Sequence, residues 1–169
     1  MPQVLRLSVT ALAVVAAVYL AGLASAQAPV KQIKLSEKQI EGFIAAHKDM
    51  AEAFDKTSAE KSDTAAQAQL DSIAKKFGFK DHSEYDDVAT NIALVMFGID
   101  PQTKAFTDPP TLAKRELDDA IADKSLPEKE RKQLVEELTE QLKTVQPIMH
   151  PGNVELVKKY YDKLEPLLQ

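Results

Sequence analysis

The chain has 169 residues, with 21 Lys and Arg against 26 Asp and Glu and a formal net charge of −5. It contains no cysteine, which excludes thiol catalysis, cysteine-ligated zinc, iron–sulfur clusters and covalent c-type haem attachment. An acidic balance with both signs interspersed argues against DNA or RNA as a partner, because neutralising phosphates needs a basic face.

The first 26 residues have the pattern of a secretory signal peptide. A positively charged start precedes an uncharged run of 24 residues from Leu7, and the small residues Ala24 and Ala26 occupy the positions that a signal peptidase reads. Pro29 breaks a continuing helix, which favours cleavage after Ala26. The run is also long enough to span a membrane, so retention as an anchor is the alternative. We expect a periplasmic or secreted protein that touches the membrane only through this segment, and only if it is uncleaved.

Cleavage leaves 143 of the 169 residues, which is one domain by length. Residues 27–35 show no periodicity and are expected to form a flexible lead-in to a single helical domain at 36–169. Six segments of that domain carry apolar side chains at three- and four-residue steps, and none shows the alternation of a strand. The sequence therefore predicts an all-α, compact bundle of five to six helices preceded by an N-terminal signal peptide.

Local signals delimit the first two predicted helices. Ser36 and Gln39 form a capping box at the start of a helix that runs to about Phe54. The second helix starts near residue 57 or 58 and ends at about Phe77.

Glycines and a second capping pair frame the third predicted helix. Gly78 ends the preceding helix in the left-handed conformation and places Phe79 to fold back on the last turn. Asp81 and Glu84 cap the third helix, which ends at Gly98. It has the widest apolar face of the domain, so we expect it at the centre of the fold.

The last three helices are predicted from similar signals. Pro109 opens the fourth helix, whose buried side includes Ile121. Ser125 and Glu128 cap the fifth, and Asn153 caps the last. The charged outer face of the fifth helix predicts a solvated surface, with a partner-binding coiled coil as the alternative.

His47 is the first candidate for chemistry, because it falls on the apolar stripe of the first predicted helix. A histidine at the edge of the core is the simplest interpretation. The alternative is an axial ligand of haem b, or a metal ligand, with Met50, Met96 or Met149 as the second ligand. No spacing singles out one such pair, so no cofactor is predicted.

His82 lies in an acidic segment at a helix start, where unpaired amide groups and the helix dipole attract carboxylates anyway. Asp86 and Asp87 point in different directions on a helix and are not expected to converge with His82 on one ion. His150 lies in a stiff connector between two helices. Capping is therefore the predicted role of the acidic segment, and a divalent metal is the alternative.

The sequence contains no His-Glu-x-x-His, Gly-x-Ser-x-Gly, phosphate loop or calcium loop. We therefore predict a soluble, non-catalytic binding or interaction protein, with a hydrolase assembled by the fold as a further alternative. Its expected partner is an envelope protein or a small apolar ligand, and the oligomeric state is left open. Where the third helix lines a pocket, its expected border is Phe43, His47, Tyr85 and Met96.

A block between residues 77 and 101 resembles a pattern in small exported helical proteins of alphaproteobacteria for which no activity is known. The residues that carry the resemblance are Phe77-Gly78-Phe79-Lys80, Glu84-Tyr85-Asp86-Asp87-Val88, Asn91-Ile92 and Gly98-Ile99-Asp100-Pro101. The resemblance implies a Gram-negative periplasmic setting and assigns no functional residue or cofactor.

Overall fold

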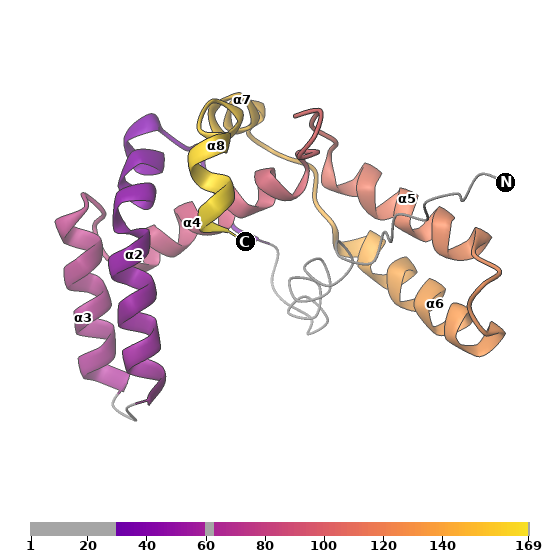
Figure 1. The fold of residues 1–169 in the computed structure, drawn as a ribbon, viewed down its shortest axis with the longest axis horizontal. Helices are drawn as coiled ribbons and strands as arrows, with labels where there is room; N and C mark the ends of the chain where they lie inside the picture. Colours follow the sequence, from indigo (N-terminus) through magenta and orange to yellow (C-terminus); the bar gives the residue numbers. More distant parts are fainter. Residues whose placement is uncertain (1–29, 60–62, 169) are drawn as a thin grey trace, which may run out of the picture.

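The computed structural model describes residues 30–59 and 63–168, which form seven α-helices and one 3-10 helix (Figure 1). These are α2 (Glu37–Ala59), α3 (Asp63–Lys76), α4 (His82–Phe97), α5 (Pro109–Ala122), α6 (Glu128–Thr144), α7 (Pro151–Lys159), α8 (Tyr161–Leu164) and η1 (Glu165–Leu167). Within the described ranges no strand forms, and the one isolated bridge joins Ile99 to Phe106. The all-α prediction is confirmed. The number of helices exceeds the predicted five or six, because the last predicted helix divides at Tyr160, where the backbone leaves helical geometry.

The predicted signal peptide, including Ala24 and Ala26, lies outside the described residues. Among the helices that the structure does describe, none has the length and hydropathy needed to cross a bilayer.

The core forms where α2, α3, α4 and α7 meet. α2 packs against both α3 and α4, and α4 also packs against α7, which gives α4 the central place expected for it (Figure 1). Apolar side chains at three- and four-residue steps fill the space between these helices. The largest fully buried ones are Ile40, Phe43, Met50, Val88, Ile92, Val95, Val157 and Leu164.

The local capping predictions for the first three helices are confirmed. The Ser36 amide donates to the Gln39 side chain at 3.0 Å, and the Gln39 amide donates to Ser36 Oγ at 3.3 Å. The Glu84 amide donates to Asp81 Oδ1 at 2.9 Å. Gly78 has a φ of +92°, the left-handed conformation expected at the end of the preceding helix.

Three predictions for the second half of the chain are wrong. Ser125 does not cap α6, because its amide and hydroxyl both donate to the carboxylate of Asp123, at 2.7 and 2.6 Å. Ile121 is 56% exposed rather than buried. Asn153 does not cap α7, which begins two residues earlier, and its side chain is buried against the N-terminal segment instead.

The N-terminal segment 30–35 is extended and is held by two buried amide side chains. Asn91 accepts from the Ile33 amide at 3.0 Å and donates to the Lys31 carbonyl at 3.0 Å. Asn153 accepts from the Leu35 amide at 2.9 Å and donates to the Ile33 carbonyl at 2.8 Å. Residues 30–35 are thus held against the core by these four bonds, and the rest of the expected lead-in, residues 27–29, lies outside the described residues.

Helices α5 and α6 form an antiparallel hairpin that stands apart from the core, and we call residues 109–144 the arm (Figure 1). In this fully described part of the chain, each of the two helices packs extensively only against the other. The two ends of the arm are joined at its base, where the Ile148 amide donates to Asp108 Oδ1 at 3.0 Å. The arm is therefore a two-helix unit attached to the core at one end.

Candidate functional site

Three of the four residues predicted to border a pocket lie together between α2 and α4. The Phe43 ring centroid lies 5.6 Å from that of His47 and 5.4 Å from that of Tyr85. Met96 is also on α4 but about 16 Å further along the helix axis, at 1.5 Å per residue, where it packs against another part of the core. The Phe43 ring thus contacts both of the other rings, and an opening among the three for a ligand remains a prediction.

His47 is half-buried on α2, and burial lowers the pKa of its imidazole below the ordinary value. The methionines considered as second axial ligands are spread over the molecule: Met50 is buried in the core, and Met149 is 66% exposed on the connector after α6. Within the described ranges, no three His, Asp or Glu side chains come together in a group suited to a metal ion. The haem and metal alternatives gain no support from this arrangement.

His82 is the residue whose environment the sequence did not predict, since it is only 8% exposed. Its ring lies near two aromatic rings, with centroid distances of 5.4 Å to Phe54 and 6.3 Å to Tyr85. Its Nδ1 lies 3.3 Å from Asp86 Oδ2. Asp86 therefore lies beside His82, a contact that was not predicted from the sequence, while Asp87 pairs with Lys31 of the N-terminal segment, so the two carboxylates point in different directions as expected. Residues four apart share a helix face, and this spacing is the signal that could have predicted the His82–Asp86 contact.

Two carboxylates flank His82, one from α3 and one from α4. Asp71 Oδ1 accepts the His82 backbone amide at 2.9 Å, and this bond holds the pKa of Asp71 below its usual value. Burial raises the pKa of Asp86, although the nearby His82 opposes that shift. His82 Nε2 is buried and has no hydrogen-bond partner in the described structure. A buried nitrogen cannot reach a substrate from outside, so in this conformation the pair does not form an open acid–base site.

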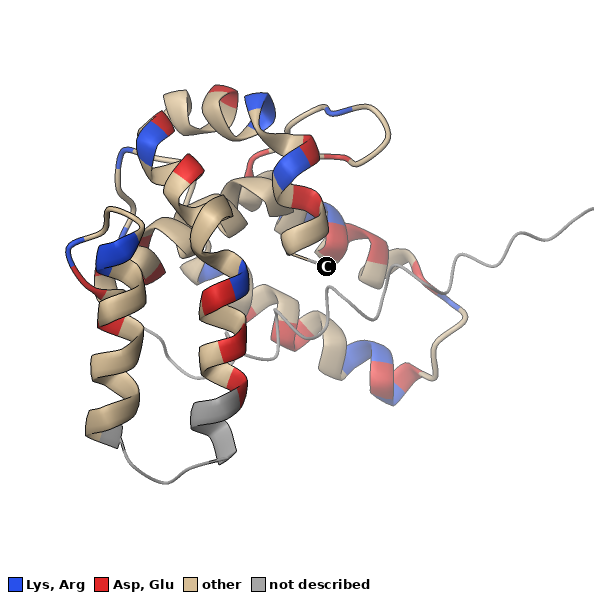
Figure 2. Ribbon diagram, turned by 60° about the vertical axis from the view of Figure 1, so that its left-hand side comes forward, with Lys and Arg blue, Asp and Glu red and all other residues tan. Residues whose placement is uncertain are grey.

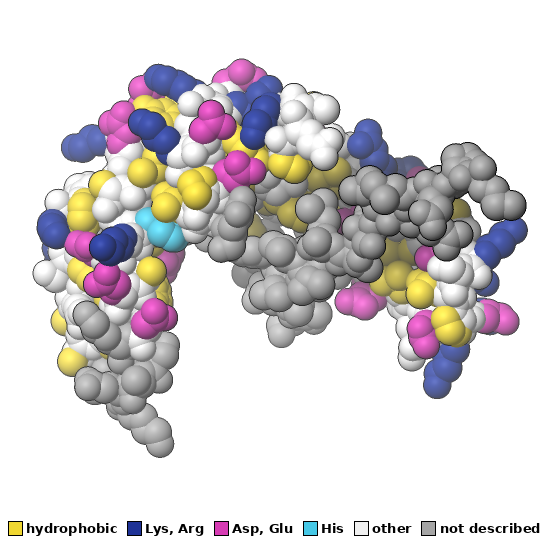
Figure 3. Space-filling view, viewed as in Figure 1, with side chains coloured by type: hydrophobic (Ala, Val, Ile, Leu, Met, Phe, Trp, Pro, Cys, Tyr) yellow, Lys and Arg dark blue, Asp and Glu magenta, His cyan; other side chains and the backbone are white. Residues whose placement is uncertain are grey.

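The arm offers a second candidate site, because most of its apolar side chains are incompletely covered. In this hairpin only Pro109, Ala120 and Leu138 are buried, and Ile121 is exposed. The half-buried apolar side chains on its two helices are Pro110, Leu112, Ala113, Leu117, Leu134, Val135 and Leu142. Hydrophobic side chains accordingly reach the surface of the arm between charged ones (Figure 3).

Charges on the arm are arranged by sign along each helix. On α5, Lys114 and Arg115 precede Asp118 and Asp119. On α6, the segment 128–132 carries a net charge of +1 from two acidic and three basic residues, and the segment 136–143 carries −2 from Glu136, Glu137, Glu140 and Lys143. Both signs are visible on the ribbon of the two helices (Figure 2). Each helix therefore has a basic first half and an acidic second half.

The sequence predicted α5 and α6 as helices but did not predict that they stand apart from the core. The sequence did carry a signal for this arrangement. The apolar stripe of α6 is wider than the strip of side chains that one neighbouring helix can cover. Comparison with protein-family models, curated proteins and solved structures finds no match to this chain.

Proposed function

We propose that this chain is an exported, non-catalytic interaction protein that contacts its partner through the arm. The observation that carries the proposal is the half-covered apolar stripe of α5 and α6. Soluble proteins keep contiguous exposed apolar surface small, and larger patches mark interaction sites. Most apolar side chains of the remaining helices belong to a shared core, although Phe54 and Phe97 are exposed, whereas no side chain of the arm belongs to that core.

The absence of a recognisable enzyme motif and the enclosed position of His82 Nε2 support a non-catalytic role. Export is proposed from the N-terminal pattern that ends at Ala26, and it has its own test. N-terminal sequencing of protein taken from the periplasm of its host is expected to begin at Gln27. A first residue within the apolar run contradicts cleavage at this site.

The partner contact is tested by crosslinking in the host cell. A photoreactive residue in place of Ile121, which is exposed on the arm, is expected to crosslink to a protein. The same residue in place of Gln69, exposed on α3, is the matched control and is expected to give no adduct. A second substitution, Leu117→Lys, is expected to abolish the adduct from position 121. An adduct that survives Leu117→Lys, or forms equally from position 69, contradicts the arm as the contact surface.

A further inference from the structure

We infer that His82 is a pH-sensitive switch in the core: when its imidazole takes up a proton, the Phe54 ring turns away from it towards solvent. The switch lies where α2 meets α4, so its action does not depend on the arm or on the proposed contact surface.

The unpaired nitrogen of His82 is the first argument. His82 is 8% exposed, and its Nε2 atom is buried without a hydrogen-bond partner among the described residues. Buried polar atoms are almost always paired, so an exception calls for a physical reason. A neutral imidazole with its one N–H group at Nδ1, which lies 3.3 Å from Asp86 Oδ2, leaves Nε2 as an acceptor only. This is the protonation state that the enclosed position of the ring tolerates best.

A second proton on the imidazole changes this balance. An imidazolium carries an N–H group on each nitrogen, and the group at Nε2 then has no acceptor in the enclosed position. A buried donor that belongs to a charged group is costly to leave unpaired, whereas water satisfies the same donor at the surface. The proton therefore binds more tightly to a conformation in which Nε2 is hydrated, and acid shifts the population towards that conformation.

The groups that face His82 differ between the three helices around it. On α4, the Asp86 carboxylate favours the charged imidazolium, and the Tyr85 hydroxyl stays neutral because burial raises its pKa to about 12. On α3, Asp71 accepts the His82 backbone amide at 2.9 Å, with Lys75 as a nearby cation. On α2, the group in contact is an uncharged phenyl ring. The facing charges thus lie on α3 and α4, and the cover that α2 provides is apolar.

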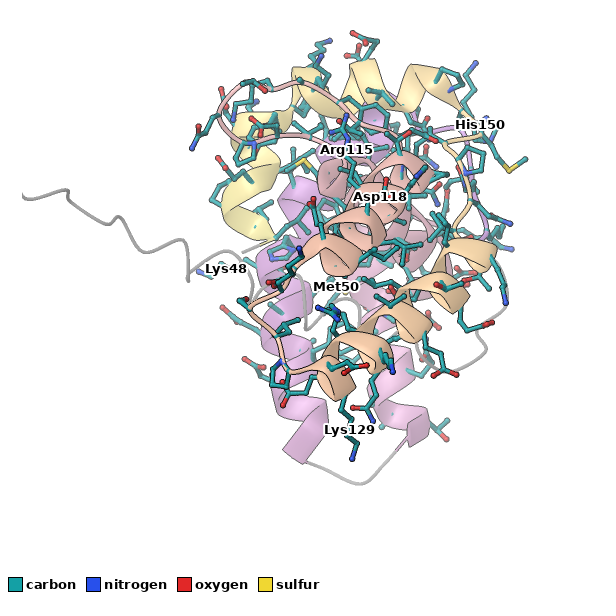
Figure 4. All side chains as sticks on the ribbon, turned by 90° about the vertical axis from the view of Figure 1, so that its right-hand side faces the viewer. Lys48, Met50, Arg115, Asp118, Lys129 and His150 are labelled. Atoms are coloured by element: carbon teal, nitrogen blue, oxygen red, sulfur yellow. The ribbon has the colours of Figure 1, made fainter. Side chains whose placement is uncertain are left out.

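The Phe54 ring is the part of this cover that can move. Its centroid lies 5.4 Å from that of His82, and Phe54 is 42% exposed. Phe54 follows Met50 by four residues and so lies on the same face of α2, away from the outward-pointing Lys48 (Figure 4). Because Met50 is only 1% exposed, burial along this face of α2 ends between Met50 and Phe54.

The other neighbours of the imidazole are held in place. Tyr85 is 5% exposed, and its ring centroid lies 5.4 Å from those of Phe43 and Phe79. The bond to Asp71 holds the backbone of His82 against α3. Hydration of Nε2 is therefore expected to displace the Phe54 ring and to leave Tyr85 in the core.

Nuclear magnetic resonance of the protein without residues 1–26 tests the switch directly. At about pH 7.5 the His82 ring is expected to be neutral and to show a nuclear Overhauser contact with the Phe54 ring. At about pH 5 the His82 ring is expected to carry a second proton, and this contact is lost. A contact that persists on the protonated ring, or a ring that stays neutral at the lower pH, overturns the inference.

A tryptophan reporter gives a second readout, since the chain contains no tryptophan. Phe54→Trp keeps an aromatic ring beside His82, and quenching of its fluorescence by acrylamide is expected to rise about twofold between pH 7.5 and 5. Adding His82→Gln is expected to abolish that rise, whereas adding His47→Gln leaves it in place. Gln69→Trp, exposed on α3, is the matched control and is expected to be quenched equally at both pH values. A rise that survives His82→Gln, or no rise in Phe54→Trp alone, overturns the switch.

Asp86→Asn tests the part that the carboxylate plays. Without a negative charge beside Nδ1 the imidazolium is less favoured, so the Phe54 contact is expected to be lost at a pH lower by about 0.5 or more. The same resonance contact measures the midpoint of this loss. A midpoint that stays the same or rises overturns the place of Asp86 in the switch.

Discussion

The side-chain oxygen of Asn153 accepts the backbone amide of Leu35 at 2.9 Å, across 118 positions of sequence. The amide group of the same side chain donates to the Ile33 carbonyl at 2.8 Å. One buried residue near the start of α7 therefore supplies an acceptor and a donor to the extended backbone ahead of α2, to which Asn91 supplies one more of each. This contact joins the N-terminal segment to the C-terminal third of the chain.

Replacing Asn153 with alanine is expected to destabilise the fold by about 2–4 kcal/mol, because it leaves a buried donor and a buried acceptor without partners. Asn153→Asp keeps an acceptor for the Leu35 amide but loses the donor to the Ile33 carbonyl, so it also destabilises the protein. Urea unfolding followed by circular dichroism measures both changes. Gln69→Ala on the exposed side of α3 is the control, with a change below about 0.5 kcal/mol. If the urea midpoints of Asn153→Ala and the control are equal, the Asn153 contact contributes nothing to the free energy of unfolding.

Two glycines provide a matched pair of substitutions. A Cβ added at Gly98 would lie 2.4 Å from Phe106 Cε2 and 2.6 Å from the Thr107 carbonyl oxygen, and backbone cannot move aside easily. We expect Gly98→Ala to destabilise the protein by about 1–3 kcal/mol, as overpacking does. Gly152 lies in the first turn of α7, and a Cβ added there would meet nothing within 4 Å, so Gly152→Ala is expected to be neutral or stabilising by up to about 1 kcal/mol. Melting temperatures that change in the same direction in both variants contradict this interpretation of the two sites.

The parts of the fold that the sequence predicted correctly depend on near neighbours. The capping pair Ser36–Gln39 closes within three residues, and Gly78 adopts the left-handed conformation that ends its own helix. Asn153 has the same cap-forming chemistry, yet its partners lie more than a hundred residues away. Local preference cannot anticipate a competing partner that only the folded chain brings close.

At the candidate sites, too, the sequence predicted some contacts correctly and missed others. Phe43 and Tyr85 were expected together because each lies on a strong apolar stripe, and their rings are in contact. The His82–Asp86 pair was missed, although a four-residue spacing places both side chains on one face of α4. Ile121 was expected to be buried because periodicity identifies an apolar side of a helix, but not whether another element covers it.

His47 makes the stability of the fold depend on pH. Burial lowers the pKa of His47 in the folded state, so between that lowered value and about 6.5 the unfolded chain binds a proton that the folded chain does not. The free energy of unfolding therefore falls as the pH drops through this window. His47→Gln is expected to flatten the dependence, measured as the urea midpoint from pH 5 to 7.5. His150→Gln in the connector controls for removing a histidine elsewhere, and a slope unchanged in His47→Gln contradicts the assignment.

The three tyrosines among the described residues are expected to resist ionisation in a protein that lacks residues 1–26, which include Tyr19. Burial raises the pKa of Tyr85 to about 12, a hydrogen bond to Glu41 raises the pKa of Tyr160 to about 12, and burial raises the pKa of Tyr161 to about 12. Absorbance of the native protein at 295 nm should stay flat through pH 10 to 11. The unfolded chain in urea should titrate near pH 10.

The same shifts predict a loss of stability at high pH. Each folded-state pKa lies above the unfolded value, so the stability that these tyrosines contribute is complete below about pH 10 and is lost as the pH rises towards about 12. Tyr160→Phe removes one of the three contributions and should reduce the steepness of that loss. Native absorbance that rises near pH 10 without unfolding excludes the proposed environment of at least one ring.

The arm is expected to unfold locally without the core. None of its described side chains belongs to the shared apolar cluster, and Leu138 is the largest apolar side chain buried within α5 and α6. Leu138→Ala removes about 2–5 kcal/mol from a unit with little other burial. Hydrogen exchange should therefore accelerate in α5 and α6 while the amides of α2 and α4 keep their protection. Val95→Ala, at a fully buried position in the last turn of α4, is the matched core substitution and should accelerate exchange in α2 and α4. If Leu138→Ala accelerates exchange in α4 as much as in α6, the arm and the core unfold as one unit, and the hairpin is not the separate module that its packing indicates.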